Sequence, residues 1–215
     1  VVEAKDVARR MPFYPEPKEE LADPGGLLKE WADYETLAFD LVEAGTLEPE
    51  AEKCAALHCP FGHKNEKLKK WEKIFLDGAK KHSAALMEVA KRDKRPEKRA
   101  AATYVMAYWT DEKKKVVDFM VDRIKDFDPM VRNNALRVLG DIAEFHPDVL
   151  VPISAIIPAL DFPRVSDRSK ALYVAYVLSQ ASNEVRQEIL RSGIPTLIGL
   201  MDCKQPDHKE LAYNI

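Results

Sequence analysis

The sequence predicts an all-α fold, a right-handed α-solenoid in which antiparallel helix pairs stack side by side. Three observations favour it. Glycine is scarce at 8 residues while proline reaches 14, a balance typical of helices bounded by prolines rather than of sheets with many tight turns. Apolar residues recur at helical spacing over most of the chain. A short pattern also returns at Arg99, Arg132 and Arg168, 33 and then 36 residues apart, as stacked repeats require.

Composition divides the chain into three parts. Residues 1–26 contain four prolines and the pair Gly25-Gly26, so we expect an extended arm there. Residues 27–65 predict a helical cap, with one helix from Leu27 to Gly45, a short helix opening at Pro49, and a segment with cysteine and histidine. Residues 66–215 carry the repeats.

The helices of the repeat region begin at prolines or at residues that can cap a helix. In chain order we expect Glu66–Ala79, Ser83–Lys91, Pro96–Trp109, Asp111–Lys125, Pro129–Phe145, Pro152–Leu160, Asp167–Ala181, Asn183–Met201 and a last helix from Lys209. Pro195 is expected to kink or split its helix, because proline removes a backbone hydrogen bond.

The segment Asp128-Pro129-Met130-Val131-Arg132, followed by Ala135-Leu136 and Leu139, resembles the first helix of a HEAT repeat. The helix Val151 to Leu160 resembles a HEAT second helix. This resemblance covers about residues 66–215 and implies the HEAT/ARM-like solenoid. The stretches Val131–Leu139, Asp167–Leu172 and Gln205–Tyr213 also resemble a group of bacterial HEAT-like proteins that are often exported.

The resemblance implies a structural role for the recurring arginines. Arg99, Arg132 and Arg168, with the acidic residues Asp128 and Asp167, are similar to the residues that form a ladder from one HEAT repeat to the next. Alanine three residues after each arginine lets paired helices approach closely.

A stack of short helix pairs presents a long groove that suits extended partners. We therefore expect a non-catalytic protein-interaction or scaffolding module, without a cofactor, that binds a protein or peptide along a groove formed by the second helices. A second candidate contact is Asn133, Asn134 and Arg137. Two asparagines within a helix are unfavourable, so we expect them to bond to the next repeat or to meet a ligand.

Two alternative functions stay open. HEAT-like folds also serve as DNA repair glycosylases, which need a basic groove. The net charge of −3 and the weakly basic later repeats disfavour nucleic acid. A metal-binding enzyme would use Cys54, His58, Cys59 and His63, residue types that zinc prefers. Their spacing is poor for zinc, since adjacent residues point in different directions.

Cys54 and Cys59 form either a disulfide or a pair of reduced, buried thiols. Pro60 forces Cys59 out of helical geometry, which lets the chain fold back. A disulfide requires an oxidising compartment, so an exported or periplasmic location is favoured over the cytoplasm. The longest apolar run, Val149 to Leu160, is shorter than the roughly 20 residues of a membrane span.

Overall fold

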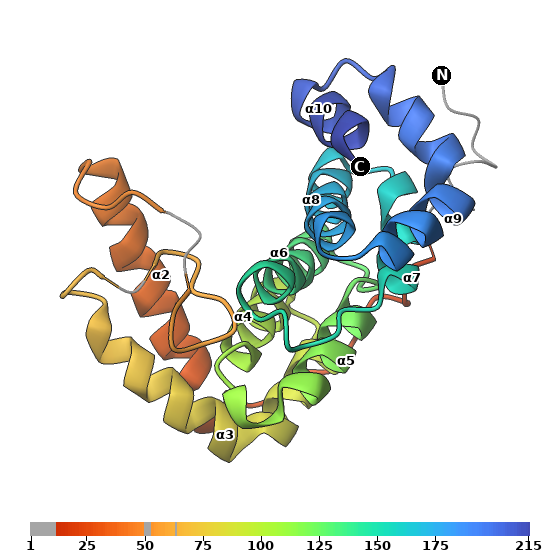
Figure 1. Cartoon of the computed structure of the whole chain (residues 1–215). Helices are drawn as coiled ribbons and strands as arrows, with labels where there is room; N and C mark the ends of the chain where they lie inside the picture. The colour runs from red at the N-terminus through yellow and green to blue at the C-terminus, as the bar shows by residue number, and fades with distance from the viewer. Residues whose placement is uncertain (1–11, 50–52, 63) are drawn as a thin grey trace.

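The computed structural model describes residues 12–49, 53–62 and 64–215, and these form an arc of helices (Figure 1). The helical elements, in chain order, are η1 (Pro24–Gly26), α2 (Leu27–Glu43), α3 (Lys69–Arg92), α4 (Pro96–Met106), η2 (Thr110–Glu112), α5 (Lys113–Arg123), α6 (Pro129–Phe145), α7 (Ile153–Ile156), η3 (Ile157–Asp161), α8 (Val165–Ala181), α9 (Asn183–Met201) and α10 (Pro206–Asn214). The predicted all-α solenoid is confirmed.

The first helices of the pairs stack in sequence order: α4 packs on α6, α6 on α8, and α8 on α10. They lie on the inner side of the arc, whereas the second helices α5, α7 and α9 lie on the outer side (Figure 1). Each pair alone would leave an apolar face in water, so burial of that face against the next pair holds the stack together.

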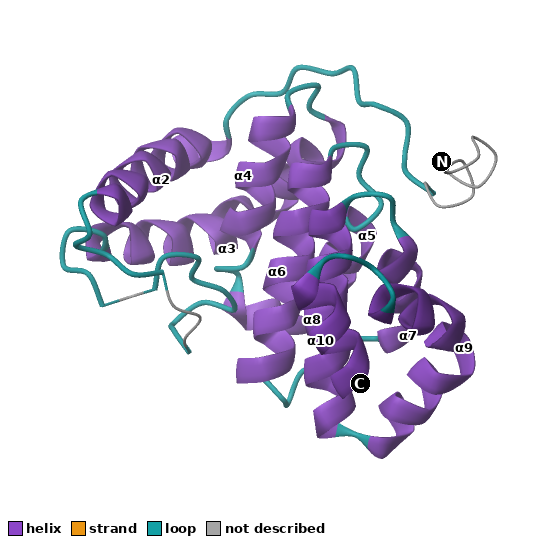
Figure 2. Cartoon of the chain, turned by 90° about the horizontal axis from the view of Figure 1, so that it is seen from above, coloured by secondary structure: helices purple, strands orange, loops and turns teal. Residues whose placement is uncertain are grey.

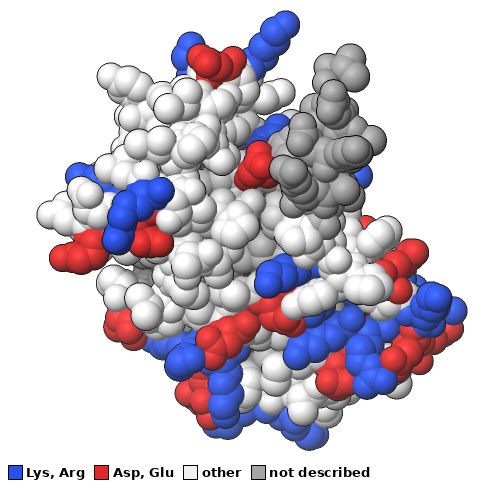
Figure 3. All heavy atoms as spheres, turned by 90° about the vertical axis from the view of Figure 1, so that its right-hand side faces the viewer, with Lys and Arg blue, Asp and Glu red and all other residues white. Residues whose placement is uncertain are grey.

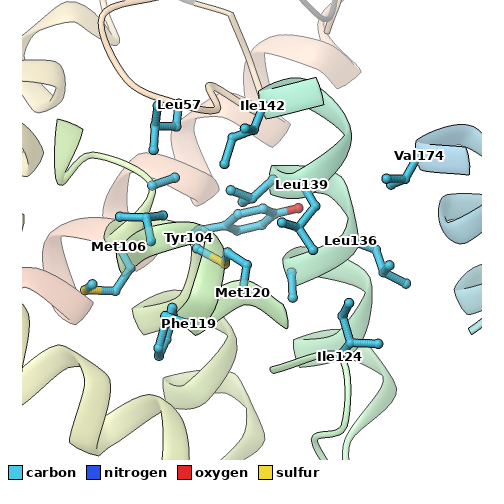
Figure 4. Packing of buried hydrophobic residues seen from close by; sticks show 14 of the residues in the cluster. Leu57, Tyr104, Met106, Phe119, Met120, Ile124, Leu136, Leu139, Ile142 and Val174 are labelled. Carbon is cyan, nitrogen blue, oxygen red and sulfur yellow. The ribbon is translucent and has the colours of Figure 1, made fainter. Parts of the chain in front are cut away.

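The core between the helix pairs is densely filled. Figure 4 shows the ring of Tyr104 between Leu57 and Ile142 on one side and Met120 and Phe119 on the other. Leu57, Ile142 and Met120 are almost fully buried. Burial of one such side chain stabilises the fold by roughly 1.5–3 kcal/mol. Because Leu57 comes from the loop 53–62, this loop is part of the core.

The helical cap docks on the first repeat through aromatic rings. The Trp31 ring of α2 lies 5.3 Å from both Phe75 of α3 and Tyr104 of α4. The indole Nε1 of Trp71 donates a hydrogen bond to Glu30 at 2.9 Å. Such tilted and edge-on ring contacts add to the apolar burial, so α2, α3 and α4 form one continuous core.

Several expected boundaries differ in the structure. The expected helices Glu66–Ala79 and Ser83–Lys91 together correspond to α3, which begins at Lys69 and has a kink at His82 (φ −115°, ψ 16°). The break expected before Ser83 is therefore present as this kink. The short helix expected to open at Pro49 does not extend into residues 53–62, which contain no helix, and residues 50–52 lie outside the described part of the chain.

The two helices with internal prolines behave differently from each other. Pro152–Leu160 is a single turn, α7, followed by the 3-10 helix η3, because Pro158 cannot donate the α-helical hydrogen bond. In contrast, α9 continues through Pro195 without splitting. The carbonyl of Arg191 that loses its partner belongs to an exposed residue, so water can satisfy it.

The described part of the expected arm, residues 12–23, lies along one edge of the stack (Figure 2). Tyr14 donates its backbone N–H to Lys125, and Glu19 forms a backbone bridge with Asp93. The Phe13 ring packs edge-on to Phe162 at 5.0 Å. The arm therefore crosses the loops that precede α4, α6 and α8.

Candidate binding site on the inner face

The loop 53–62 is fixed to the inner side of the stack by covalent and polar contacts. The sulfurs of Cys54 and Cys59 form a disulfide, with a Cα–Cα distance of 6.4 Å. Leu57 donates its backbone N–H to the carbonyl of Ala107 at 2.9 Å. Of the two alternatives that the sequence leaves open, the structure contains the bridge, and these contacts fix the loop against the inner side of the stack.

His58 anchors this loop to α6. Its Nδ1 donates to Asp141 Oδ2 at 2.6 Å, and its ring stacks on Tyr104 at 5.1 Å. Both His58 and Asp141 are buried. Within the described part of the chain, the Nε2 atom of His58 has no hydrogen-bond partner. The pair therefore positions the loop rather than exposing an imidazole to solvent.

The expected metal ligands are not assembled. Cys54 and Cys59 use their sulfurs in the disulfide, so neither can provide a thiolate. His63 lies outside the described residues. The described residues contain no cluster of three or more potential metal ligands.

A cavity of about 300 Å³ opens between this loop and the helices α6 and α8. It is lined from the loop side by Pro49, His58, Cys59 and Pro60, and from the helices by Arg137, Asp141, Lys170 and Tyr173. A volume of this size is at the lower end of the range for ligand pockets in proteins. It can accept one side chain or one small molecule.

Two cations on adjacent helices share this cavity. Arg137 of α6 donates its Nε to Asn133 Oδ1 at 2.9 Å. Lys170 of α8 is half-buried, and burial, followed by the charge of Arg137, lowers the pKa of its ammonium group. No carboxylate of the described residues forms a direct ion pair with either group, although the charges of Asp141 and Asp207 act to raise the pKa of Lys170. The cavity wall therefore carries two cations that are not in direct contact with an acid.

The opposite wall of the cavity depends on a glycine. Tyr173 packs over Gly140 of α6, where an added Cβ would lie 2.9 Å from the ring. The Tyr173 hydroxyl donates to Glu144, and burial together with this carboxylate raises the pKa of Tyr173. Close approach of α6 and α8 at Gly140 thus holds the phenol ring in place.

A second hollow, of about 470 Å³, adjoins the cavity because the two share Arg137 and Lys170. Its other lining residues are Pro129, Met130, Asn133, Arg164, Ser166, Ser169 and Asp207. Together the two hollows form a groove, which we call the inner groove, along α6 and α8. It lies on first helices, whereas we expected the contact groove on second helices.

A third hollow, of about 500 Å³, lies at the second helix α5. Its lysines already have acidic partners: Lys113 contacts Asp148 at 3.0 Å, and Lys114 contacts Asp118 at 2.6 Å. These pairs leave little charge for a ligand. The inner groove is the better candidate because its two central cations are unpaired.

Two of the recurring arginines, Arg99 and Arg132, are buried in the fold. Arg99 donates to both oxygens of Asp126 at 3.1 and 2.8 Å, and Arg132 donates twice to Asp167 Oδ2 at 2.9 and 2.7 Å. Each arginine also donates Nη1 to backbone carbonyls in the loop before its own helix. Each buried pair thus joins one repeat to the next.

Two members of the expected ladder differ from this pattern. Asp128 accepts from the backbone N–H of Met130 and caps α6. Asp126, two residues earlier, takes the ladder position instead, because a capping carboxylate must point back at its own helix. Arg168 donates to the carbonyls of Phe162 and Pro163 at 2.7 and 2.8 Å.

The three polar residues of α6 that we expected as a contact, Asn133, Asn134 and Arg137, lie in different environments. Asn134 is buried and donates to the carbonyl of Ala100 in the preceding repeat at 3.2 Å. Asn133 donates to Ser166 in the following repeat at 3.4 Å and also lines the second hollow. Arg137 lines both hollows.

Sequence reasoning missed two residues of the site. The only signal for Asp141 was a carboxylate among buried apolar positions, and Lys170 gave no signal.

The stacked helix pairs and the buried arginine ladder define an α-solenoid repeat protein. Residues 83–159 match a family described as HEAT repeats, so this part of the chain is similar to HEAT repeats. No curated protein matches the sequence. In the part of the chain that the structure describes, every helix is too short or too polar to cross a membrane.

Proposed function

We propose that this protein is a non-catalytic interaction module whose inner groove binds a polypeptide partner. HEAT repeats commonly mediate protein interactions. The observation that carries the proposal is the pair of adjoining hollows on α6 and α8, in which Arg137 and Lys170 form no direct ion pair with a described residue. Arg137 is exposed and Lys170 is half-buried, so both cations can reach a ligand in the groove.

The charge pattern of the groove favours a polypeptide over DNA. Its cations Arg137, Arg164 and Lys170 alternate with Asp141 and Asp207. A DNA-binding groove needs consecutive cations that neutralise successive phosphates. On the face seen in Figure 3, Lys and Arg are mixed with Asp and Glu in the lower part, and the described atoms of the upper part are largely uncharged.

Site-specific photocrosslinking tests this function. A photoreactive benzoyl-phenylalanine would replace Ser166, which is exposed and lines the groove. The control would carry the same group at Lys73, an exposed residue of α3 that lines neither hollow. We expect a discrete polypeptide to crosslink at position 166 alone.

The crosslinked polypeptide would then be purified and titrated calorimetrically against the intact protein. We expect binding to weaken at least tenfold when Arg137 and Lys170 are both replaced by alanine. The same polypeptides crosslinking at positions 73 and 166, or an unchanged affinity of the double variant, would contradict the proposed function.

A further inference from the structure

The cavity is a more selective environment than the rest of the inner groove. It is bordered on one side by the disulfide-fixed loop and on the other by Arg137, Lys170 and Tyr173. The Nε of Arg137 donates to Asn133, which fixes the guanidinium plane and leaves its two Nη groups for a ligand. Two positive groups from adjacent helices therefore line the same cavity.

We propose that this cavity receives a single carboxylate of the partner polypeptide, held between Arg137 and Lys170. This inference rests on the function proposed for the inner groove. A guanidinium fork binds both oxygens of a carboxylate, and the lysine ammonium adds a point charge. The carboxylate is that of a glutamate or aspartate side chain or of a chain terminus.

The remaining wall residues set the charge of the ligand. Asp141 lines the cavity, and one of its oxygens is used by His58 at 2.6 Å. Its negative charge repels a second charge on the ligand, so the site favours a carboxylate over a phosphate dianion. The Tyr173 hydroxyl is directed to Glu144 and does not compete for the cations.

Two acetylated model peptides test the inference with the full chain. One is Gly-Gly-Glu-Gly-Gly-amide, and the matched control has glutamine in place of glutamate. Lysine carbons next to the ammonium would be labelled with carbon-13, and the pKa of Lys170 followed by NMR. A carboxylate bound beside this ammonium stabilises its charged form, so we expect the glutamate peptide alone to raise the pKa of Lys170.

Further probes identify the source of the anion. Acetylated tetraglycine with a free carboxyl terminus distinguishes a chain terminus from a side chain, and inorganic phosphate is the dianion probe. We expect Arg137→Gln to weaken binding of the better carboxylate peptide at least tenfold, whereas Arg164→Gln, which alters only the second hollow, changes it less than twofold. Circular dichroism checks that both variants stay folded.

The inference is overturned if glutamate and glutamine peptides bind equally with no response of Lys170, or if phosphate binds more tightly than either carboxylate peptide. These results are separable from the test of the groove. A partner that crosslinks at position 166 while no carboxylate moves Lys170 would leave the proposed function intact and remove the carboxylate site. If the pKa of Lys170 responds to a carboxylate peptide but no polypeptide crosslinks at position 166, the carboxylate site stands and the proposed function is removed.

Discussion

Replacement of Arg132 by methionine tests the ladder that holds consecutive repeats together. Arg132 is 2% exposed and donates two hydrogen bonds to Asp167 and one each to the carbonyls of Asp126 and Phe127. Methionine fills similar volume but leaves the Asp167 carboxylate buried without its cation. Loss of one partner of a buried pair lowers the free energy of unfolding by about 3–5 kcal/mol.

This loss is a large share of the total, because domains are stable by only about 5–15 kcal/mol. Urea unfolding followed by circular dichroism measures it, with a matched control, Arg191→Met. Arg191 is exposed and pairs with Glu188 at 2.9 Å, and an exposed pair contributes less than about 1 kcal/mol. In the variant Arg132→Met/Asp167→Leu both charges leave, so we expect at least half of the loss to be recovered.

The penalty should also depend on pH. Burial raises the pKa of Asp167, while the charge of Arg132 lowers it. Without Arg132 the folded-state pKa rises further above its unfolded value, so stability present below about pH 4 is lost as the pH rises through the folded-state pKa. We expect Arg132→Met to lose more at pH 7 than at pH 4. A loss under about 1 kcal/mol at pH 7, or one independent of pH, would refute this account of the ladder.

Three further predictions concern the walls of the site and the last helix. Replacement of Cys54 and Cys59 by serine should lower the free energy of unfolding by about 2 kcal/mol, because the bridge closes a short loop. Urea unfolding measures this loss, and dithiothreitol should lower the urea midpoint of the wild-type protein by the same amount. An unchanged midpoint contradicts the prediction. Gly140→Ala places a methyl group 2.9 Å from the Tyr173 ring. The cost of overpacking, about 1–3 kcal/mol, should exceed the gain in helix propensity of about 1 kcal/mol, so we expect a lower melting temperature. A higher melting temperature would contradict this prediction. Burial, and next the charge of Arg168, lowers the pKa of His208. The stability present above about pH 6.5 should therefore fall as the pH drops towards 5. In urea titrations, His208→Gln should reduce the dependence of the free energy of unfolding on pH over this range, and an unchanged dependence would contradict the prediction.

The sequence predicts the repeat architecture well where the signals are local. Pro129–Phe145 and Asn183–Met201 have the expected bounds, because Asp128 and Ser182 accept hydrogen bonds from the first turns of these helices. The break expected before Ser83 is present as a kink at His82 within α3. In contrast, the helix expected from Pro152 to Leu160 is divided between α7 and η3, because Pro158 interrupts the α-helical hydrogen bonds.

The candidate site is less predictable because its residues meet only in three dimensions. Cys54 and Cys59 are five residues apart and could be paired from sequence, but His58 and Asp141 are 83 residues apart. Lys170 resembles any surface lysine until α8 is placed beside α6. Local chemistry therefore indicated one wall of the cavity, and the tertiary stack supplied the other.

The distribution of polar contacts explains why the free charge lies on the inner side of the first helices. At one edge of the stack, the arm crosses the loops that precede α4, α6 and α8, where Phe13 covers the Arg132 guanidinium at 3.9 Å. The outer lysines at α5 are paired with acids. An arginine on α6 and a lysine on α8 remain, and the disulfide-fixed loop borders the cavity that they line. Arg137 is exposed and Lys170 is half-buried, so both groups can reach a ligand, and their convergence beside this loop is the strongest physical argument for a ligand at this place.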